Sequence, residues 1–155
     1  MRSCILLLVL LAPLARADDR LTLVGLDGED VELRPAKEQV LLLHFWATWC
    51  PTCAEDIRHL QNASTMCSND RVRPLLVNVG EGDEVIREFV KEHSLRLPVL
   101  RDPKGRLWRR SDGRGLPANL FLSNESERTD VGPKTEKEWR SLLASRGCSN
   151  ALPTE

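Results

Sequence analysis

The sequence predicts one α/β domain with a mixed central sheet, helices on both faces and an N-terminal β-hairpin. Two almost continuous apolar runs, 39–46 and 73–79, are each followed by a segment in which apolar residues recur at helical spacing. This order is typical of strands that are buried on both faces and joined by helices. A hairpin pattern precedes the first run, and a second hairpin and a final helix follow, which makes the sheet mixed rather than purely parallel.

The first half of the domain begins with two short alternating segments, 21–23 and 31–33, on either side of Asp27-Gly28. An Asp-Gly pair between such segments is a signal for a β-hairpin. The run 39–46 then predicts a buried strand. A helix is expected over 51–66, because it starts with a proline, which suits the first helical position, and has apolar residues at helical spacing.

The second half continues the alternation of strands and helices and then changes to an antiparallel pair. Glycine and proline residues mark the turns between the elements. The segment 107–115 is ambiguous, because its apolar and charged residues follow no clear period. The expected elements are a strand at 73–79, a helix at 82–94, a short apolar piece at 97–100, a hairpin of 118–122 with 128–131, and a helix at 134–146.

Residues 1–17 have the pattern of a signal peptide. A short positive start is followed by the apolar stretch 5–14 and by Ala15-Arg16-Ala17, which offers small residues at the two positions that a signal peptidase reads. The stretch is shorter than the about 20 residues that span a bilayer. We therefore expect cleavage after Ala17 and a mature domain of residues 18–155 that is exported, periplasmic or otherwise extracytoplasmic. The alternative is that the segment stays uncleaved as a weak anchor.

The charge balance points away from nucleic acid. The chain has 22 Lys and Arg residues against 23 Asp and Glu, and loss of Arg2 and Arg16 with the signal peptide leaves 20 basic residues and a net charge near −3. No basic stripe marks a nucleic-acid or membrane surface. The length of the mature chain suits one domain. We expect a monomer with no nucleic-acid partner and no stable membrane insertion after signal cleavage.

The most informative motif is Trp49-Cys50-Pro51-Thr52-Cys53, which lies where the first buried strand gives way to its helix. Two thiols separated by two residues can close into a disulfide and reopen. The start of a helix concentrates unpaired N–H groups and partial positive charge, which favours the thiolate of Cys50. The motif therefore indicates thiol–disulfide redox chemistry, which needs no cofactor.

A pair of cysteines at this spacing can also be half of a structural zinc site. Such a site needs a second pair of ligands at comparable spacing. The mature chain offers only His59, Cys67 and Cys148 as further candidates, and these form no second CxxC or HxxxH pattern. We therefore expect no metal.

Four cysteines remain after Cys4 is lost with the signal peptide. An even number in an exported chain permits two disulfides, with three connectivities. The motif favours a redox disulfide Cys50–Cys53, which leaves Cys67–Cys148 as a second, structural disulfide. The alternative is two unpaired thiols, or one paired with another chain.

The segment 45–53 closely resembles the active-site strand and helix of TlpA-like thioredoxins, which are extracytoplasmic thiol:disulfide oxidoreductases. The WCPTC form looks most like the reductases of cytochrome c maturation. Gly115-Leu116-Pro117, followed by an apolar strand, is similar to the family's cis-proline segment, and the leading hairpin and Val131-Gly132-Pro133 are also similar to family landmarks. These features occur in the expected order over about residues 21–143. The resemblance thus implies a thioredoxin-like fold for nearly the whole mature domain.

The resemblance also implies roles for single residues. Cys50 is the attacking thiolate, Cys53 is the resolving thiol, and Pro117 is the cis-proline that faces them. Leu116 would pair with a bound extended peptide in the substrate groove, and Trp49 would shield the disulfide and form an apolar docking lip. The implied partners are a protein disulfide substrate and an upstream thiol donor protein. An ordinary trans turn at Pro117 is the alternative that the residues leave open.

In a thioredoxin-like topology the active-site helix and the C-terminal helix lie on the same sheet face and run the same way. Cys67 follows the first of these helices and Cys148 follows the second. Both thiols should therefore emerge at the edge of the sheet far from the active site.

The sequence departs from the family pattern in three places. One is after the proline, where Ala118-Asn119 stands in place of the commoner Thr or Glu. His44 lies where thioredoxins have a buried acid, so it could relay a proton to or from Cys53, or it could be a neutral core histidine. Asp56 lies where the family often has glutamate, next to Glu55. It could take part in proton transfer at the disulfide, or both acids could complement the helix dipole.

We compare four functional hypotheses for this sequence. An exported dithiol reductase is the leading hypothesis, and an oxidase or isomerase of the same fold is the second, separated from the first by the reduction potential. A peroxidase of the peroxiredoxin kind needs threonine or serine three residues before its reactive cysteine, where this chain has Ala47. The last is a non-catalytic binding module crosslinked by the disulfide, but so short a loop constrains the unfolded chain little.

Overall fold

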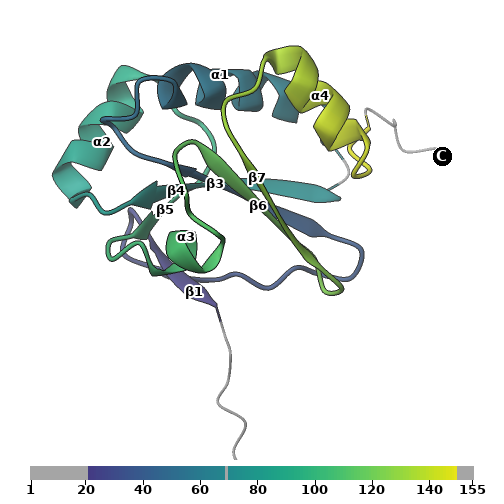
Figure 1. Cartoon of the computed structure of the whole chain (residues 1–155), viewed down its shortest axis with the longest axis horizontal. Helices are drawn as coiled ribbons and strands as arrows, with labels where there is room; N and C mark the ends of the chain where they lie inside the picture. Colours follow the sequence, from purple (N-terminus) through teal and green to yellow (C-terminus); the bar gives the residue numbers. More distant parts are fainter. Residues whose placement is uncertain (1–20, 69, 150–155) are drawn as a thin grey trace, which may run out of the picture.

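The computed structural model of the chain describes residues 21–68 and 70–149 (Figure 1). The predicted signal peptide lies outside the described residues, so its cleavage stays a prediction. Within the described part, seven strands form one mixed sheet, and four helices cover its two faces. The predicted α/β fold class is therefore confirmed.

The elements follow one another in nearly the predicted order. The strands are β1 (Thr22–Gly25), β2 (Asp30–Glu32), β3 (Val40–Trp46), β4 (Val72–Val79), β5 (Val99–Asp102), β6 (Ala118–Leu122) and β7 (Glu127–Val131). The helices are α1 (Cys53–Ser64), α2 (Asp83–Glu92), α3 (Arg106–Arg110) and α4 (Glu136–Ala144). The ambiguous segment 107–115 contains most of α3, which is too short for a periodic pattern to be visible in the sequence.

The sheet has the order β2-β1-β5-β4-β3-β6-β7. The two apolar runs form β3 and β4, which pair in parallel along the whole of β3, and β4 pairs in parallel with β5. β6 joins the other edge of β3 in antiparallel direction, and β7 and the N-terminal hairpin complete the two sides. The parallel centre brings the loops that follow β3 and β4 to the same edge of the sheet.

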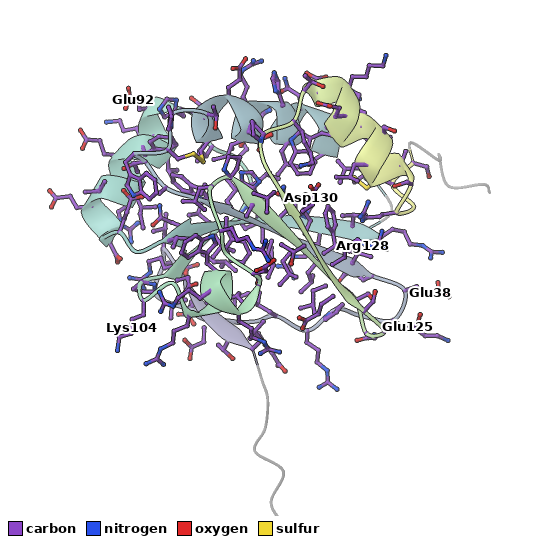
Figure 2. The ribbon with its side chains drawn as sticks, in the orientation of Figure 1. Glu38, Glu92, Lys104, Glu125, Arg128 and Asp130 are labelled. Carbon is purple, nitrogen blue, oxygen red and sulfur yellow. A yellow bond between two sulfur atoms is a disulfide. The ribbon has the colours of Figure 1, made fainter. Side chains whose placement is uncertain are left out.

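Figure 1 shows α1, α2 and α4 along one face of the sheet and α3 on the other. Alternate residues of β3 face the two layers: Leu42 and Trp46 pack under α1, α2 and α4, whereas Leu43 and Phe45 pack on the other face with Leu107 of α3. This is why β3 reads as a continuous apolar run. Charged side chains such as Glu92, Lys104 and Glu125 lie at the outside of the molecule (Figure 2).

Helix α1 begins two residues later than the sequence predicts. Thr52 is its N-cap residue and Cys53 its first residue, whereas Pro51 belongs to a turn in which the Cys53 N–H donates to the Cys50 carbonyl oxygen at 3.2 Å. The tight loop between the two cysteines turns the chain before the helix can start. Cys50 therefore lies just ahead of the helix, and Cys53 lies in its first turn.

The far ends of α1 and α4 are joined covalently. Cys67 follows α1 and Cys148 follows α4, and their sulfurs form a disulfide with the Cα atoms 4.5 Å apart. The Ser68 hydroxyl also donates to the Ser149 carbonyl oxygen at 3.1 Å. The same-face arrangement of the two helices that the resemblance implied is therefore present, with a crosslink where their chains leave the core.

Candidate active site

Cys50 and Cys53 form a disulfide at the point where β3 leads into α1. Their Cα atoms lie 5.4 Å apart. The Cys50 residue is 4 % exposed and Cys53 is fully buried, so a partner reaches the Cys50 sulfur more readily. The positive end of α1 faces this pair, which lowers the free energy of a thiolate formed there.

The segment before Cys50 combines an exposed aromatic side chain with a fixed backbone. Trp49 is 69 % exposed. Thr48 donates its backbone N–H to Glu81 Oε2 at 2.8 Å and its hydroxyl to Glu81 Oε1. Glu81 Oε2 also accepts a hydrogen bond from Asn78 Nδ2 at 2.6 Å. A large apolar surface is thus held beside the disulfide by one carboxylate from the loop after β4.

Glu81 was not predicted as a site residue, because the acids around it suit the start of α2 equally well. The sequence did contain a usable signal. Glu81 follows one buried strand as Thr48 follows the other, and the ends of parallel neighbours meet at one sheet edge.

The Leu116–Pro117 peptide bond is cis. Pro117 comes directly before β6, and the pairing of Ala118 with Phe45 places it beside the end of β3 that leads to the disulfide. Leu116 packs against the apolar cluster that contains both Cys50 and Cys53. The predicted cis-proline segment therefore borders the same cluster as the disulfide.

Three buried polar side chains, from β3, β6 and α1, lie close together on the sheet face that carries α1 and α4. His44 Nδ1 is 2.8 Å from Asn119 Oδ1, and His44 Nε2 is 3.9 Å from Asp56 Oδ2. Asp56 Oδ1 accepts hydrogen bonds from Trp139 Nε1 at 2.7 Å and from the Lys134 backbone N–H at 2.9 Å. The cluster joins β3, β6, α1 and the start of α4.

The His44 ring is neutral around pH 7 in this oxidised form. Burial lowers the pKa of His44 below its usual 6.5, and the neighbouring Asp56 carboxylate and the Asn119 hydrogen bond only partly oppose that effect. With a hydrogen on Nδ1 donated to Asn119, His44 Nε2 keeps its lone pair. This nitrogen can accept a proton without leaving the protein interior.

Asp56 and Glu55 differ in their surroundings although they are neighbours. Asp56 is buried and faces His44, whereas Glu55 is exposed and pairs with Arg58 across one helical turn at 3.4 Å. Only Glu55 fits the interpretation of a solvated acid at a helix start. Asn119 was noted in the sequence only as the second residue after the proline, and its pairing with His44 across β3 and β6 was not predicted.

The described residues contain no group of three or more histidine, cysteine or acidic side chains arranged to hold a metal ion. Within residues 21–68 and 70–149, no helix is long and apolar enough to cross a membrane.

Comparison with known proteins extends these observations. Residues 15–125 match the model of the AhpC/TSA family. The chain is 33 % identical over 122 residues to Sporulation thiol-disulfide oxidoreductase A of Bacillus subtilis (strain 168), which covers 74 % of this chain and 73 % of that protein. It is 27 % identical over 129 residues to Thiol-disulfide oxidoreductase ResA of Halalkalibacterium halodurans, with 80 % of this chain and 73 % of the relative covered.

Solved structures agree with these sequence relatives. The crystal structure of StoA from Bacillus subtilis superposes with a TM-score of 0.68 at 26 % identity, over 79 % of this chain and 95 % of that one. DsbF of Mycobacterium tuberculosis superposes with a TM-score of 0.71 over 82 % of this chain and 95 % of its own, and at 22 % identity it supports the fold alone. The chain therefore belongs to the AhpC/TSA family, has a thioredoxin-like fold, and is a thiol-disulfide oxidoreductase whose cysteine pair is Cys50–Cys53.

Proposed function

We propose that this protein is an exported dithiol reductase of disulfides in partner proteins. In the reduced protein the Cys50 thiolate attacks a disulfide sulfur of the partner, which releases one partner thiol and forms a mixed disulfide. Cys53 then attacks Cys50, the second partner thiol leaves, and the Cys50–Cys53 disulfide remains. The pair of electrons passes from the dithiol to the partner, and an upstream thiol donor protein restores the dithiol.

The observation behind this proposal is the contrast between the two sulfurs of one disulfide. Cys50 keeps 4 % of its surface exposed, follows the exposed Trp49 and lies in the cluster against which Leu116 packs, whereas Cys53 is fully buried in the first turn of α1. An attacking thiol needs access to a partner, and a resolving thiol needs access only to Cys50. Ala47, three residues before Cys50, supplies no hydroxyl of the kind that peroxidase chemistry requires, which favours disulfide exchange.

Cys53 must lose a proton before it can resolve the mixed disulfide, and we assign the acceptor role to His44. The support is that His44 is neutral by burial, that its Nε2 atom has no hydrogen-bond partner among the described residues, and that the ring contacts Trp139 in the layer that also holds Cys53. Asp56 would stabilise the imidazolium that forms, because a carboxylate 3.9 Å away favours the protonated ring.

We further propose that the substrate binds as an extended segment beside Leu116, with Trp49 covering the apolar residues around its cysteine. A residue directly before a proline cannot continue a central strand through that proline, so its backbone groups stay open to an added strand. Export to an extracytoplasmic space and a place in cytochrome c maturation follow from the signal-like start and the WCPTC motif, and both are part of the proposal.

Two measurements test the proposal. The reduction potential of the Cys50–Cys53 pair should lie nearer the about −270 mV of thioredoxin than the about −120 mV of DsbA, and a value near the latter would make the protein an oxidase. A Cys53→Ser variant expressed in the native compartment should accumulate mixed disulfides through Cys50. A role in cytochrome c maturation requires captured chains with the CxxCH haem-attachment motif, and captured chains without it would assign another pathway.

A further inference from the structure

The indole of Trp108 lies against the loop that leads to the cis peptide bond. Its Nε1–H donates to the carbonyl oxygen of Gly115 at 3.3 Å. A Cβ atom at Gly113 would lie 2.5 Å from the Trp108 carbonyl oxygen and 2.6 Å from the indole carbons Cδ2 and Cε2, distances that real Cβ atoms do not adopt. The loop backbone therefore approaches the face of the indole as closely as a glycine allows.

Trp108 is itself fixed to the sheet. Asp102, the last residue of β5, is buried and accepts the Trp108 backbone N–H at 3.0 Å and the Arg106 N–H at 2.8 Å through its two carboxylate oxygens. Leu107 is buried in the apolar layer under the sheet. The five-residue helix α3 thus holds the indole in a set position relative to the strands.

The hydrogen bond to Gly115 also orients the next peptide group. The Gly115–Leu116 peptide is trans, and in a trans peptide the C=O and the N–H point in opposite directions. Because the Gly115 carbonyl points to Trp108, the Leu116 N–H points away from it. Within the described residues this N–H has no hydrogen-bond acceptor.

We propose that Trp108 is a positioning residue for substrate binding: it sets the direction of the Leu116 N–H so that this group can donate to the backbone of an extended partner peptide. The inference rests on the proposed function, in which Leu116 pairs with the substrate. Trp108 touches neither the substrate nor the cysteines, and it acts through the Gly115–Leu116 peptide plane.

A purely structural Trp108 would have a different signature. Loss of packing under the sheet would weaken the fold and lower all reactions of the reduced protein together. Loss of the indole N–H as a positioning group would lower only reactions in which the substrate has a peptide backbone to pair with Leu116. Two small disulfide probes that release the same leaving group distinguish a loss of packing from a loss of substrate positioning.

The first probe is an extended peptide whose single cysteine forms a mixed disulfide with thionitrobenzoate, and the second is the symmetric disulfide of thionitrobenzoate. In each case the Cys50 thiolate attacks, coloured thionitrobenzoate leaves, and Cys53 then resolves the mixed disulfide. The reduced protein loses two electrons and each probe disulfide is cleaved to two thiols. The quantity measured is the ratio of the two second-order rate constants, peptide over symmetric disulfide.

For Trp108→Phe this ratio should fall about fivefold, the order expected from the loss of one neutral hydrogen bond. Gly113→Ala tests the same contact from the side of the loop, because the added Cβ would force the backbone and the indole apart, and the ratio should fall in the same direction. The matched control is Leu107→Val, which loosens the packing of α3 but leaves the indole N–H. Its melting temperature should fall while the ratio keeps the wild-type value.

A wild-type ratio in both the Trp108→Phe and Gly113→Ala proteins would overturn the inference, as would an equal fall for Leu107→Val, which would reduce the role of Trp108 to packing. Failure of the proposed function would look different. The wild-type protein would then not release thionitrobenzoate from the peptide faster than its Cys50→Ser variant does.

Discussion

The two disulfides of this protein differ in almost every physical respect although they lie at opposite ends of the same helix. Cys50–Cys53 has a sequence separation of 3 and precedes α1, whereas Cys67–Cys148 has a separation of 81 and follows the last turns of α1 and α4. In the chain-entropy model the short loop stabilises the folded state by about 2 kcal/mol and the long one by about 4.5 kcal/mol.

The helix ends add a second difference. Cys50 and Cys53 lie at the positive end of α1, where a thiolate is stabilised, whereas Cys67 and Cys148 lie beyond the negative ends of two helices, where a thiolate is destabilised. The exposed fraction does not distinguish the two disulfides, since Cys50 is 4 % and Cys148 is 3 % exposed. Loop length and helix polarity, rather than access alone, therefore suit Cys50–Cys53 to exchange and Cys67–Cys148 to crosslinking.

The largest effect is expected at the first disulfide. Cys50→Ser removes the sulfur to which we assign the attack, so the rate of reduction of a protein disulfide should fall about a thousandfold or more. The double variant Cys67→Ser/Cys148→Ser is the matched control, and it should retain the wild-type rate at a temperature where it is folded. A comparable loss of rate in the double variant would end the division of roles between the two disulfides.

The same double variant should show the largest effect on stability. Removing the long crosslink should lower the free energy of unfolding by about 4 kcal/mol, less any strain that the bond holds in the native state. Urea unfolding of the oxidised proteins measures this difference. If reduction of Cys50–Cys53 alone destabilises the protein more than the double substitution does, the assignment of Cys67–Cys148 as the structural bond is wrong.

A smaller effect should distinguish the two sulfurs of the active pair. After mild reduction that leaves Cys67–Cys148 intact, iodoacetamide at neutral pH should label Cys50 about tenfold faster than Cys53, because the thiolate lies in front of the helix and Cys53 is enclosed. Peptide mapping after a short pulse gives the ratio. Faster labelling of Cys53 would reverse the two roles.

The smallest effect is expected at His44, the buried histidine of β3. The pKa of His44 is lowered below 6.5 by burial. Between that lowered pKa and 6.5 the unfolded chain binds a proton that the native state does not, so the free energy of unfolding should fall as the pH decreases through this window. The slope is at most about 1.4 kcal/mol per pH unit.

His44→Asn should flatten the pH dependence of the free energy of unfolding. It should also change the pH dependence of disulfide reduction, because the variant lacks the proton acceptor that we propose for Cys53. Unfolding and reduction rates measured over a pH series for both proteins provide the test. A folded His44→Asn protein with the wild-type pH profile of reduction would exclude the proton relay and leave His44 as a core residue.

The sequence was sufficient where the information is local. The apolar run of β3, the Asp-Gly hairpin and the CxxC motif each depend on neighbouring residues, so their structures could be predicted from spacing and residue type. The resemblance to a known family predicted the cis-proline segment. Together with the number of cysteines it also predicted the second disulfide. The start of α1 was predicted two residues early, because the turn at Pro51 and Thr52 is closed by the disulfide loop rather than by helix propensity.

The contacts between polar groups that are distant in the sequence could not be predicted from local patterns. The contacts of Asp56 with Trp139, of His44 with Asn119 and of Trp108 with Asp102 and Gly115 join separate strands, helices and loops. Helix α3 likewise depends on bonds from β5 rather than on a pattern of its own. Residue type and spacing were thus enough to predict the Cys50–Cys53 pair and the strand and helix that hold it. The surroundings of this pair and the position of the loop before β6 arise from packing, because burial and side-chain contacts exist only once the sheet and helices are assembled.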